Sequence, residues 1–473
     1  MDAFDGAVEV AGAIRRKEVS PSEVAELYLK RMDELEPELN AFSFRADDEV
    51  RAAAAQATQA VADAADPDDL PPFHGVPLPI KNLNWVAGWP CTYGSAAATR
   101  DPRPSSDPIV ERFQAAGFVL SGMTNSPEFG AVSYTESDTH GITRNPWDTA
   151  RTPGGSSGGA AAAVASGMAP IAHASDGGGS IRIPSSCCGL VGMKGSRGRI
   201  PNDLVELEGF ATNGVVARTV ADAAALYDVL AVVDPYHWIA APQPAKPWAE
   251  LATQVPVRLR VGYTTVAPLG LPVDPAGVTA VERTVAVLTE AGHEVTETTL
   301  DVPRMDEFVA SFITVWNTGS AWSPVEDWDA LEPHNAALRA AARQVDSVTF
   351  AEDVRRTQQL AKGVIRPLVE DFDLIVTPTM ACLPPEVGSW RVGMEENPEV
   401  ALLNCYPMAV FTSICNITGL PAISVPVHHD DASGLPVGVQ LIAGPWRDEL
   451  AFQVAAQLEQ ALPWSDRRPV VGG

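Results

Sequence analysis

Helical and strand-like segments alternate from one end of the chain to the other, and this alternation most constrains its fold. Short apolar runs bounded by Gly or Pro predict strands at residues 75–82, 117–124, 169–176, 259–263, 293–300, 373–379, 421–427 and 437–444. The segments between them have helical spacing or are rich in Ala and predict helices at residues 20–37, 47–65, 107–116, 160–167, 274–292, 325–366 and 448–462. This order favours an α/β fold in which helices cover both faces of a sheet.

The first of these helices and one βαβ unit are the most clearly marked elements. Ser20 as N-cap, Pro21 at the first helical position and Glu23 form a capping box. Pro37 is expected to end that helix. The strand, helix and strand over residues 259–300 read as one βαβ unit. No internal repeat or long low-complexity linker interrupts the chain, so residues 1–473 are predicted to form a single domain.

Charge and hydropathy exclude several classes of partner. The chain has 60 acidic and 33 basic residues, for a net charge of −27. Because an acidic surface repels phosphate, direct binding of nucleic acid is not expected, and the charge is expected mainly to keep the protein soluble. No apolar stretch reaches the length of about 18 residues that suggests a membrane span. Acidic residues at the N-terminus replace the basic ones of a signal peptide, so we expect a cytoplasmic protein without a membrane partner.

The cysteines and histidines suggest no metal site. Six cysteines are scattered along the chain without a C-x-x-C pair, and no H-E-x-x-H occurs among the eight histidines. Free thiols in a reducing compartment are therefore expected, with no metal and no cofactor.

Two loops rich in Gly and Ser flank an Ala-rich segment, residues 154–159 (GGSSGG) and 176–180 (DGGGS). The first contains G-x-S-x-G, the nucleophile elbow of α/β-hydrolases, but a loop rather than a strand precedes it. Neither loop has the lysine of a phosphate-binding P-loop or the spacing G-x-G-x-x-G. Taken singly, each loop is explained as well by an ordinary Gly/Ser loop without chemistry as by a functional loop.

The second loop, taken with a distant lysine, suggests nucleophilic chemistry. It follows a predicted strand and ends in Ser180, and consecutive glycine N–H groups in such a turn suit a developing oxyanion. A serine hydroxyl needs a base to attack a carbonyl. Lys81 ends the apolar strand 75–82, where burial would favour its neutral form. The alternative is a lysine whose stem lies on apolar surface while its ammonium reaches water.

Lys81 and the two loops together resemble the amidase signature family, whose members use a Ser–cis-Ser–Lys triad. Further segments agree with the family, at residues 124–129 (TNSPEF), 143–147 (TRNPW), 189–194 (GLVGMK), 214–224 (GVVARTVADAA), 417–427 (ITGLPAISVPV) and 434–444 (GLPVGVQLIAG). The resemblance covers essentially the whole chain. It implies the amidase signature fold, α/β with a large mixed twisted sheet covered by helices on both faces. It also implies a catalytic core over residues 70–225 and a variable, pocket-forming region over residues 238–400.

The resemblance assigns the triad as follows. Ser180 is expected to be the acylated nucleophile and Lys81 the base. Ser156 is expected to relay the proton between them, from a cis Gly155–Ser156 peptide. This implies hydrolysis of a carboxylic amide to an acid and an amine or ammonia, without a cofactor.

The same resemblance assigns supporting roles around the triad. The oxyanion hole is expected to consist of the N–H groups of Gly177, Gly178, Gly179 and Ser180. The residues expected to hold the loops and support the network are Asp176, Arg182 and Ser157.

Four positions depart from the usual family pattern without removing a triad member. Asn82 follows the lysine where Asp is usual, and Gly177 replaces a common Thr. Met123 and Ala160 replace a common Lys and a common Ser. We expect these changes to affect the shape of the pocket rather than the presence of activity.

The substrate is suggested by two features. Trp316, Trp322 and Trp328 occur in the variable region, either as ordinary core aromatics or as the lining of a site for an apolar or aromatic acyl group. The form HASDGGGSIRIP is similar to that of actinobacterial amidases and of hydrolases of the cyclic dimer of 6-aminohexanoate, a nylon oligomer. The expected partner is therefore a small apolar, aromatic or nylon-oligomer-like amide.

A second hypothesis is a glutaminase-type subunit of a partner-dependent amidotransferase. Asn82 after the lysine and the Trp-rich region argue mildly against a glutamine-specific site. The resemblance also leaves a homodimer open.

Overall fold

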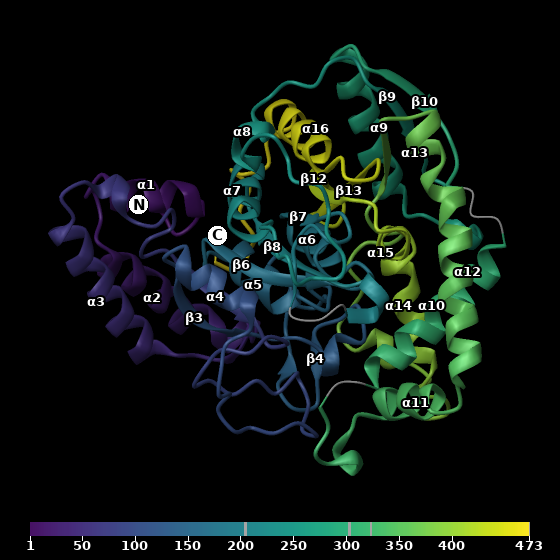
Figure 1. The fold of residues 1–473 in the computed structure, drawn as a ribbon, viewed down its shortest axis with the longest axis horizontal. Coiled ribbons are helices and arrows are strands. Elements are labelled where there is room, and N and C mark those ends of the chain that lie inside the picture. The colour runs from purple at the N-terminus through teal and green to yellow at the C-terminus, as the bar shows by residue number, and fades with distance from the viewer. Residues whose placement is uncertain (203–205, 301–303, 322–323, 473) are drawn as a thin grey trace.

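The computed structural model describes residues 1–202, 206–300, 304–321 and 324–472. Within these residues the largest sheet has eight strands in the order β10–β9–β11–β13–β12–β7–β8–β6 (Figure 1). Its strands are β6 (Ile171–Asp176), β7 (Val191–Lys194), β8 (Thr212–Ala217), β9 (Arg260–Tyr263), β10 (Glu294–Glu297), β11 (Leu374–Pro378), β12 (Ala422–Asp430) and β13 (Leu435–Ala443). The strand β9 runs parallel to β10 and β11, and the other neighbours are antiparallel, so the sheet is mixed as expected.

Two smaller sheets accompany the large one in the described part of the chain. One has the order β1–β3–β2, formed by β1 (Phe42–Phe44), β3 (Val119–Thr124) and β2 (Pro77–Lys81). The other pairs β4 (Glu136–Ser137) with β5 (Gly141–Ile142). Because β2 contacts β6, the end of β2 and the end of β6 are brought to one place.

Helices surround these sheets (Figure 1). The α-helices are α1 (Ala7–Arg15), α2 (Pro21–Leu39), α3 (Asp47–Asp63), α4 (Pro108–Ala115), α5 (Gly158–Ala165), α6 (Arg182–Cys188), α7 (Val220–Leu230), α8 (Trp248–Ala252), α9 (Pro275–Glu290), α10 (Met305–Ser320), α11 (Pro333–Ala342), α12 (Ser347–Ile365), α13 (Pro367–Glu370), α14 (Val400–Ala409), α15 (Ser413–Thr418) and α16 (Asp448–Ala461). Short 3-10 turns include η3 (Glu206–Gly209) and η5 (Trp328–Ala330).

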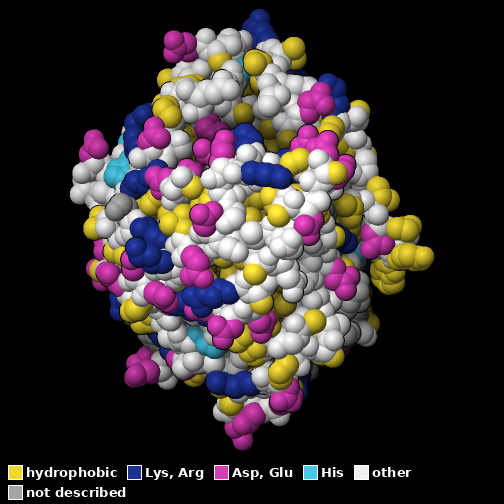
Figure 2. Space-filling model, turned by 90° about the vertical axis from the view of Figure 1, so that its left-hand side faces the viewer, with side chains coloured by type: hydrophobic (Ala, Val, Ile, Leu, Met, Phe, Trp, Pro, Cys, Tyr) yellow, Lys and Arg dark blue, Asp and Glu magenta, His cyan; other side chains and the backbone are white. Residues whose placement is uncertain are grey.

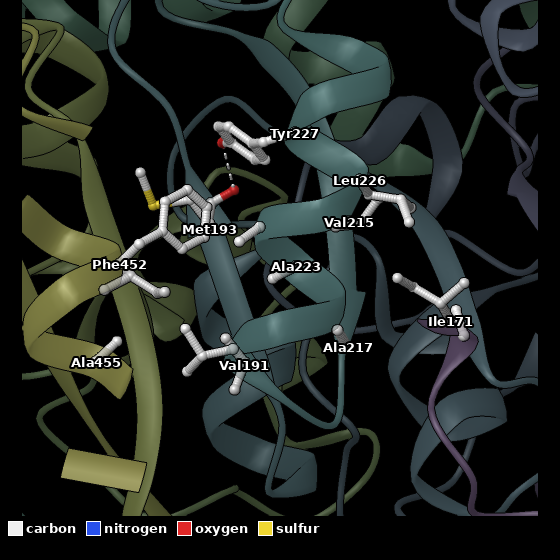
Figure 3. Packing of buried hydrophobic residues seen from close by; sticks show 14 of the residues in the cluster. Ile171, Val191, Met193, Val215, Ala217, Ala223, Leu226, Tyr227, Phe452 and Ala455 are labelled. Carbon is white, nitrogen blue, oxygen red and sulfur yellow. Dashed lines mark hydrogen bonds between the residues drawn. The ribbon is translucent and has the colours of Figure 1, made fainter. Parts of the chain in front are cut away.

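Both faces of the large sheet are buried, as the sequence predicted. Side chains alternate along a strand, so neighbouring residues of β8 enter different cores. Val215 and Ala217 belong to one hydrophobic cluster, whereas Val216 belongs to another that contains α5. Figure 3 shows the first cluster, where α7 and α16 pack on β7 and β8 and the Tyr227 hydroxyl donates to the Met193 carbonyl at 3.1 Å.

The most clearly marked elements form as expected. The Ser20 side chain accepts from the Glu23 N–H in a capping box, with Pro21 at the start of α2. The parallel pair of β9 and β10, joined by α9, is the predicted βαβ unit.

Two predicted helix boundaries are wrong. Pro37 does not end its helix, because a proline near the C-terminal end removes only one late hydrogen bond, and α2 runs on to Leu39. Asn40 ends it instead, in the left-handed conformation that suits a C-cap. The helix predicted over residues 325–366 is two helices, since Pro333 begins α11 and the Asp346 side chain caps α12.

The net charge of −27 is spread over a surface that carries both acidic and basic side chains. On the face drawn in Figure 2, acidic and basic side chains are interspersed rather than gathered into one patch. Among the described residues, no helix is both long and apolar enough to cross a membrane.

Candidate active site

The two Gly/Ser loops and Lys81 meet beside the ends of β2 and β6. Lys81 is the last residue of β2, and Ser156 lies just before α5. Ser180 lies between the end of β6 and the start of α6. Ser156 is 3% exposed and Ser180 is 8% exposed, so both serines are nearly withdrawn from bulk water.

A buried lysine is bonded to the first serine. The Lys81 Nζ donates to the Ser156 Oγ at 2.8 Å, and the lysine side chain is fully buried. Burial lowers the pKa of Lys81 to about 7, against the opposing charges of Asp176 and Glu206. The alternative of an ammonium in water therefore does not apply, and a substantial fraction of this amine is neutral at neutral pH.

Ser175 is a partner of Lys81 that sequence reasoning missed. Its Oγ lies 3.0 Å and its carbonyl oxygen 3.4 Å from the Lys81 Nζ. A neutral amine has two N–H donors and one lone pair. If the two N–H groups go to the two oxygens of Ser175, the lone pair is left for the hydroxyl proton of Ser156.

The strand β6 explains why Ser175 lies on the lysine. His173 and Ser175 are two residues apart, so their side chains point to the same face. The His173 Nδ1 accepts the Lys81 backbone N–H at 3.2 Å, and its Nε2 lies 3.0 Å from the Asn213 Oδ1. The period-2 alternation of the strand was the signal that would have singled out Ser175.

The loop that carries Ser156 has the expected cis peptide. The Gly155–Ser156 bond is cis. A Cβ at position 155 would lie 2.7 Å from backbone atoms of Tyr134, so only glycine fits there. The Ser157 Oγ donates to the Ser175 carbonyl at 3.2 Å and thereby links this loop to β6.

The amides of the second loop divide into two groups. The Gly179 N–H donates to the Asp176 Oδ1 at 2.7 Å, and the Ile181 N–H donates to the Oδ2 at 3.2 Å. In the described residues, no acceptor within the protein is recorded for the N–H groups of Gly177, Gly178 and Ser180. The Gly179 amide is thus already occupied, in contrast to the expectation that it contributes to an oxyanion hole.

A buried ion pair holds the start of α6 against β6. The Arg182 Nη2 and Nε donate to the two carboxylate oxygens of Asp176 at 2.9 and 3.0 Å, and both side chains are fully buried. Burial alone would raise the pKa of the Asp176 carboxyl, but the charge and hydrogen bonds of Arg182 outweigh it and lower the pKa to about 2. The pair stays ionised at every pH at which the protein would be assayed.

Residues far along the chain complete this ion pair. The Asn416 Nδ2 donates to the Asp176 Oδ1 at 2.8 Å, and Arg182 donates to the Gln440 Oε1 at 2.6 Å and to the Thr412 carbonyl at 2.8 Å. Sequence reasoning missed Thr412, Asn416 and Gln440 as partners of this pair, because more than 200 residues separate them from the loops. Gln440 lies in the segment 434–444, but nothing in that segment indicates the contact with Arg182.

The tryptophans that the sequence offered as a possible substrate-site lining differ in their distance from the two Gly/Ser loops. A Cβ at Gly177 would lie 3.2 Å from the Trp316 Cζ3, so this ring lies over the second Gly/Ser loop, residues 176–180, called the glycine loop below. Trp328 is 45% exposed, and its ring centroid lies 4.3 Å from the Arg343 guanidinium carbon. It is therefore not assigned to the lining of the substrate site. Trp322 lies outside the described residues.

Asn82, the most conspicuous departure from the family pattern, has a local partner. Its Nδ2 donates to the Thr92 Oγ1 at 2.8 Å, and its Oδ1 accepts the Thr92 N–H at 3.0 Å. The amide therefore fixes the chain after β2.

Comparison with known proteins agrees with this geometry. A family model described as Amidase matches residues 23–452. The chain is 34% identical to the 6-aminohexanoate-cyclic-dimer hydrolase of Paenarthrobacter ureafaciens, over 99% of this chain and 97% of that one. It is 33% identical to the acylamidase of Rhodococcus erythropolis, over 98% and 96% of the two chains. A solved structure of 6-aminohexanoate cyclic dimer hydrolase with substrate is similar over 100% of both chains, with a TM-score of 0.93 and 33% identity.

The mixed sheet, the grouping of Lys81 with the two serine loops and these similarities define an amide hydrolase of α/β type. The chain belongs to the amidase signature family.

Proposed function

We propose that this amidase cleaves its substrate through an acyl-enzyme on Ser180, with Ser156 and Lys81 as the proton relay. The observation that carries the proposal is the 2.8 Å contact between the fully buried Lys81 Nζ and the Ser156 Oγ. Only a neutral amine can accept a proton, and burial lowers the pKa of Lys81 to about 7. A base of this strength suits general base catalysis near neutral pH.

The proposed reaction has two stages, acylation and deacylation of Ser180. Lys81 takes the proton of Ser156, Ser156 takes that of Ser180, and the Ser180 Oγ attacks the amide carbonyl. The N–H groups of Gly177, Gly178 and Ser180 stabilise the negative oxygen of the tetrahedral intermediate. The relayed proton returns to the nitrogen as the C–N bond breaks. Water then attacks the acyl-enzyme, giving the acid and free Ser180.

The amides proposed as substrates are small apolar, aromatic or nylon-oligomer-like ones. Two relatives support this choice by name, a 6-aminohexanoate-cyclic-dimer hydrolase and an acylamidase. Phe312 and Trp316 support it by position, because both rings lie within 4 Å of where a Cβ at Gly178 would be.

The proposal is tested by intact-mass analysis after exposure to a fluorophosphonate. The expected result is a single adduct on the parent protein that is lost in Ser180→Ala. The exposed Ser347 begins α12, and Ser347→Ala is the matched control that keeps the adduct. An adduct that survives in Ser180→Ala, or no adduct on the folded parent, contradicts the assignment. Hydrolysis of a panel of amides that includes glutamine then separates a free-standing amidase from a glutaminase-type subunit.

A further inference from the structure

The helix α10 places an aromatic side chain beside the amides proposed to bind the oxyanion. A Cβ built on Gly177 would lie 3.2 Å from the Trp316 Cζ3, and one built on Gly178 would lie 3.7 Å from the same atom. The six-membered edge of the indole is therefore in contact range of both glycines. An acyl group whose oxygen is bound by these N–H groups would therefore lie beside this edge.

Neighbouring rings hold Trp316 in place. The Phe312 ring, one turn earlier on α10, packs against it with a centroid distance of 5.6 Å. Phe312 in turn stacks on Phe210, next to β8, at 6.1 Å. Because tilted and stacked aromatic pairs add favourable contact energy, these rings stabilise the observed orientation of Trp316.

The indole N–H of Trp316 is unsatisfied within the described part of the protein. Its Nε1 is buried, and among the described residues no hydrogen-bond acceptor is recorded for it. Buried donors are nearly always paired, since an unpaired one costs free energy. Nε1 belongs to the five-membered ring, across the indole from the Cζ3 that faces the glycines. The missing acceptor would therefore be a polar oxygen farther along a bound acyl group.

We propose that Trp316 determines acyl specificity, by selecting amides whose acyl chain is apolar near the scissile carbonyl and carries a hydrogen-bond acceptor farther along. The ring packs against the chain, and the N–H donates to the acceptor, such as a second amide carbonyl. This inference rests on the proposed function, because it takes Gly177 and Gly178 as the oxyanion site. It extends that function by naming the residue and the substrate group that it recognises.

Two substrates of equal size test the role of the N–H. Adipamide carries a second carboxamide, and 6-methylheptanamide replaces that group with an isopropyl group that has the same number of heavy atoms. Trp316→Phe keeps an aromatic ring but removes the donor. It is expected to lower kcat/KM for adipamide by about tenfold and that for 6-methylheptanamide by less than about twofold.

Two further variants separate this role from a structural one. Trp316→Ala removes the ring as well and is expected to lower kcat/KM for both amides. Trp328→Phe makes the matched substitution at the exposed tryptophan that packs on Arg343, and is expected to change neither. Thermal unfolding and the rate of labelling by a small fluorophosphonate show whether each variant is folded with a reactive Ser180.

Three outcomes overturn the inference. In the first, Trp316→Phe lowers kcat/KM for adipamide and for 6-methylheptanamide by the same factor. In the second, Trp316→Phe changes kcat/KM for neither amide. In the third, the parent hydrolyses neither amide although Ser180 is labelled. A parent that shows no labelling at all contradicts the proposed function itself, so the two failures are distinguishable.

Discussion

At the scale of single residues, the proposed relay makes the activity depend on the protonation state of Lys81. Burial lowers the pKa of this amine to about 7, and the relay needs its neutral form. We therefore predict that kcat/KM is low in acid and rises as the pH passes through about 7. A pH–rate profile with an amide substrate measures this directly. A profile that rises only near pH 10 would mean that the lysine is not desolvated during turnover.

Ser175 is predicted to orient Lys81 through its two oxygens. Ser175→Ala removes the acceptor at 3.0 Å, which lowers the pKa of the lysine further because an acceptor favours the charged form. We expect kcat/KM to fall about tenfold and the acid limb of the profile to move to lower pH. Ser175→Thr keeps a hydroxyl and is the matched control. It should retain the parent kcat/KM and the parent position of the acid limb. A loss of rate without movement of the acid limb would indicate only a packing role.

At the scale of elements, the loop between β6 and α6 depends on a glycine that no other residue replaces. A Cβ at Gly179 would lie 2.1 Å from the Thr412 Oγ1, and the backbone there has φ +130°. We predict that Gly179→Ala destabilises the protein by about 1–3 kcal/mol or more and slows labelling of Ser180.

The control for this variant is Gly434→Ala. Gly434 also has positive φ, but nothing lies within 4 Å of its added Cβ, so only the backbone cost of about 1 kcal/mol is expected. Urea unfolding compares the two, and equal losses would mean that contact with Thr412 is unimportant.

The ion pair between Asp176 and Arg182 joins β6 to α6 and is predicted to be sensitive to removal of one partner. Arg182→Gln leaves a buried carboxylate unpaired, which costs about 3–5 kcal/mol. The matched change at an exposed pair, Arg447→Gln beside Glu449, should cost about 0–1 kcal/mol. Urea unfolding at pH 7 checks both.

The pH dependence of stability provides a second readout of the same pair. The pKa of Asp176 is lowered from 3.8 to about 2, so its contribution is present above pH 3.8 and is lost as the pH falls towards 2. Arg182→Gln should therefore lose most of this part of the acid dependence. A variant whose stability follows the parent curve at a constant offset would contradict this account.

At the scale of the whole molecule, local patterns predicted the fold well. The alternation of strands and helices, the capping box at Ser20 and the βαβ unit over residues 259–300 all rest on neighbours in sequence. They predicted the α/β class, with helices on both faces of a sheet, and the position of Lys81 at a strand end. The mixed character of the sheet followed from the family resemblance. The cis Gly155–Ser156 peptide followed from the family resemblance.

The parts that failed depend on tertiary contacts. The helix α10 was not predicted, and its position over the glycine loop brings Trp316 to the site. Asn416 and Gln440 reach the ion pair from the C-terminal half of the chain. Occupation of the Gly179 amide by Asp176 is a matter of loop geometry that composition does not encode.

The central claim is that an amide substrate acylates Ser180. Trypsin cleaves after Arg151 and Arg182, so one peptide, residues 152–182, carries Ser156, Ser157 and Ser180 together. Rapid acid quenching of the enzyme during turnover, followed by fragmentation of this peptide, locates the acyl group. We predict that the added mass lies on the C-terminal side of Asp176, on Ser180. An acyl group on Ser156 or Ser157 would contradict the account.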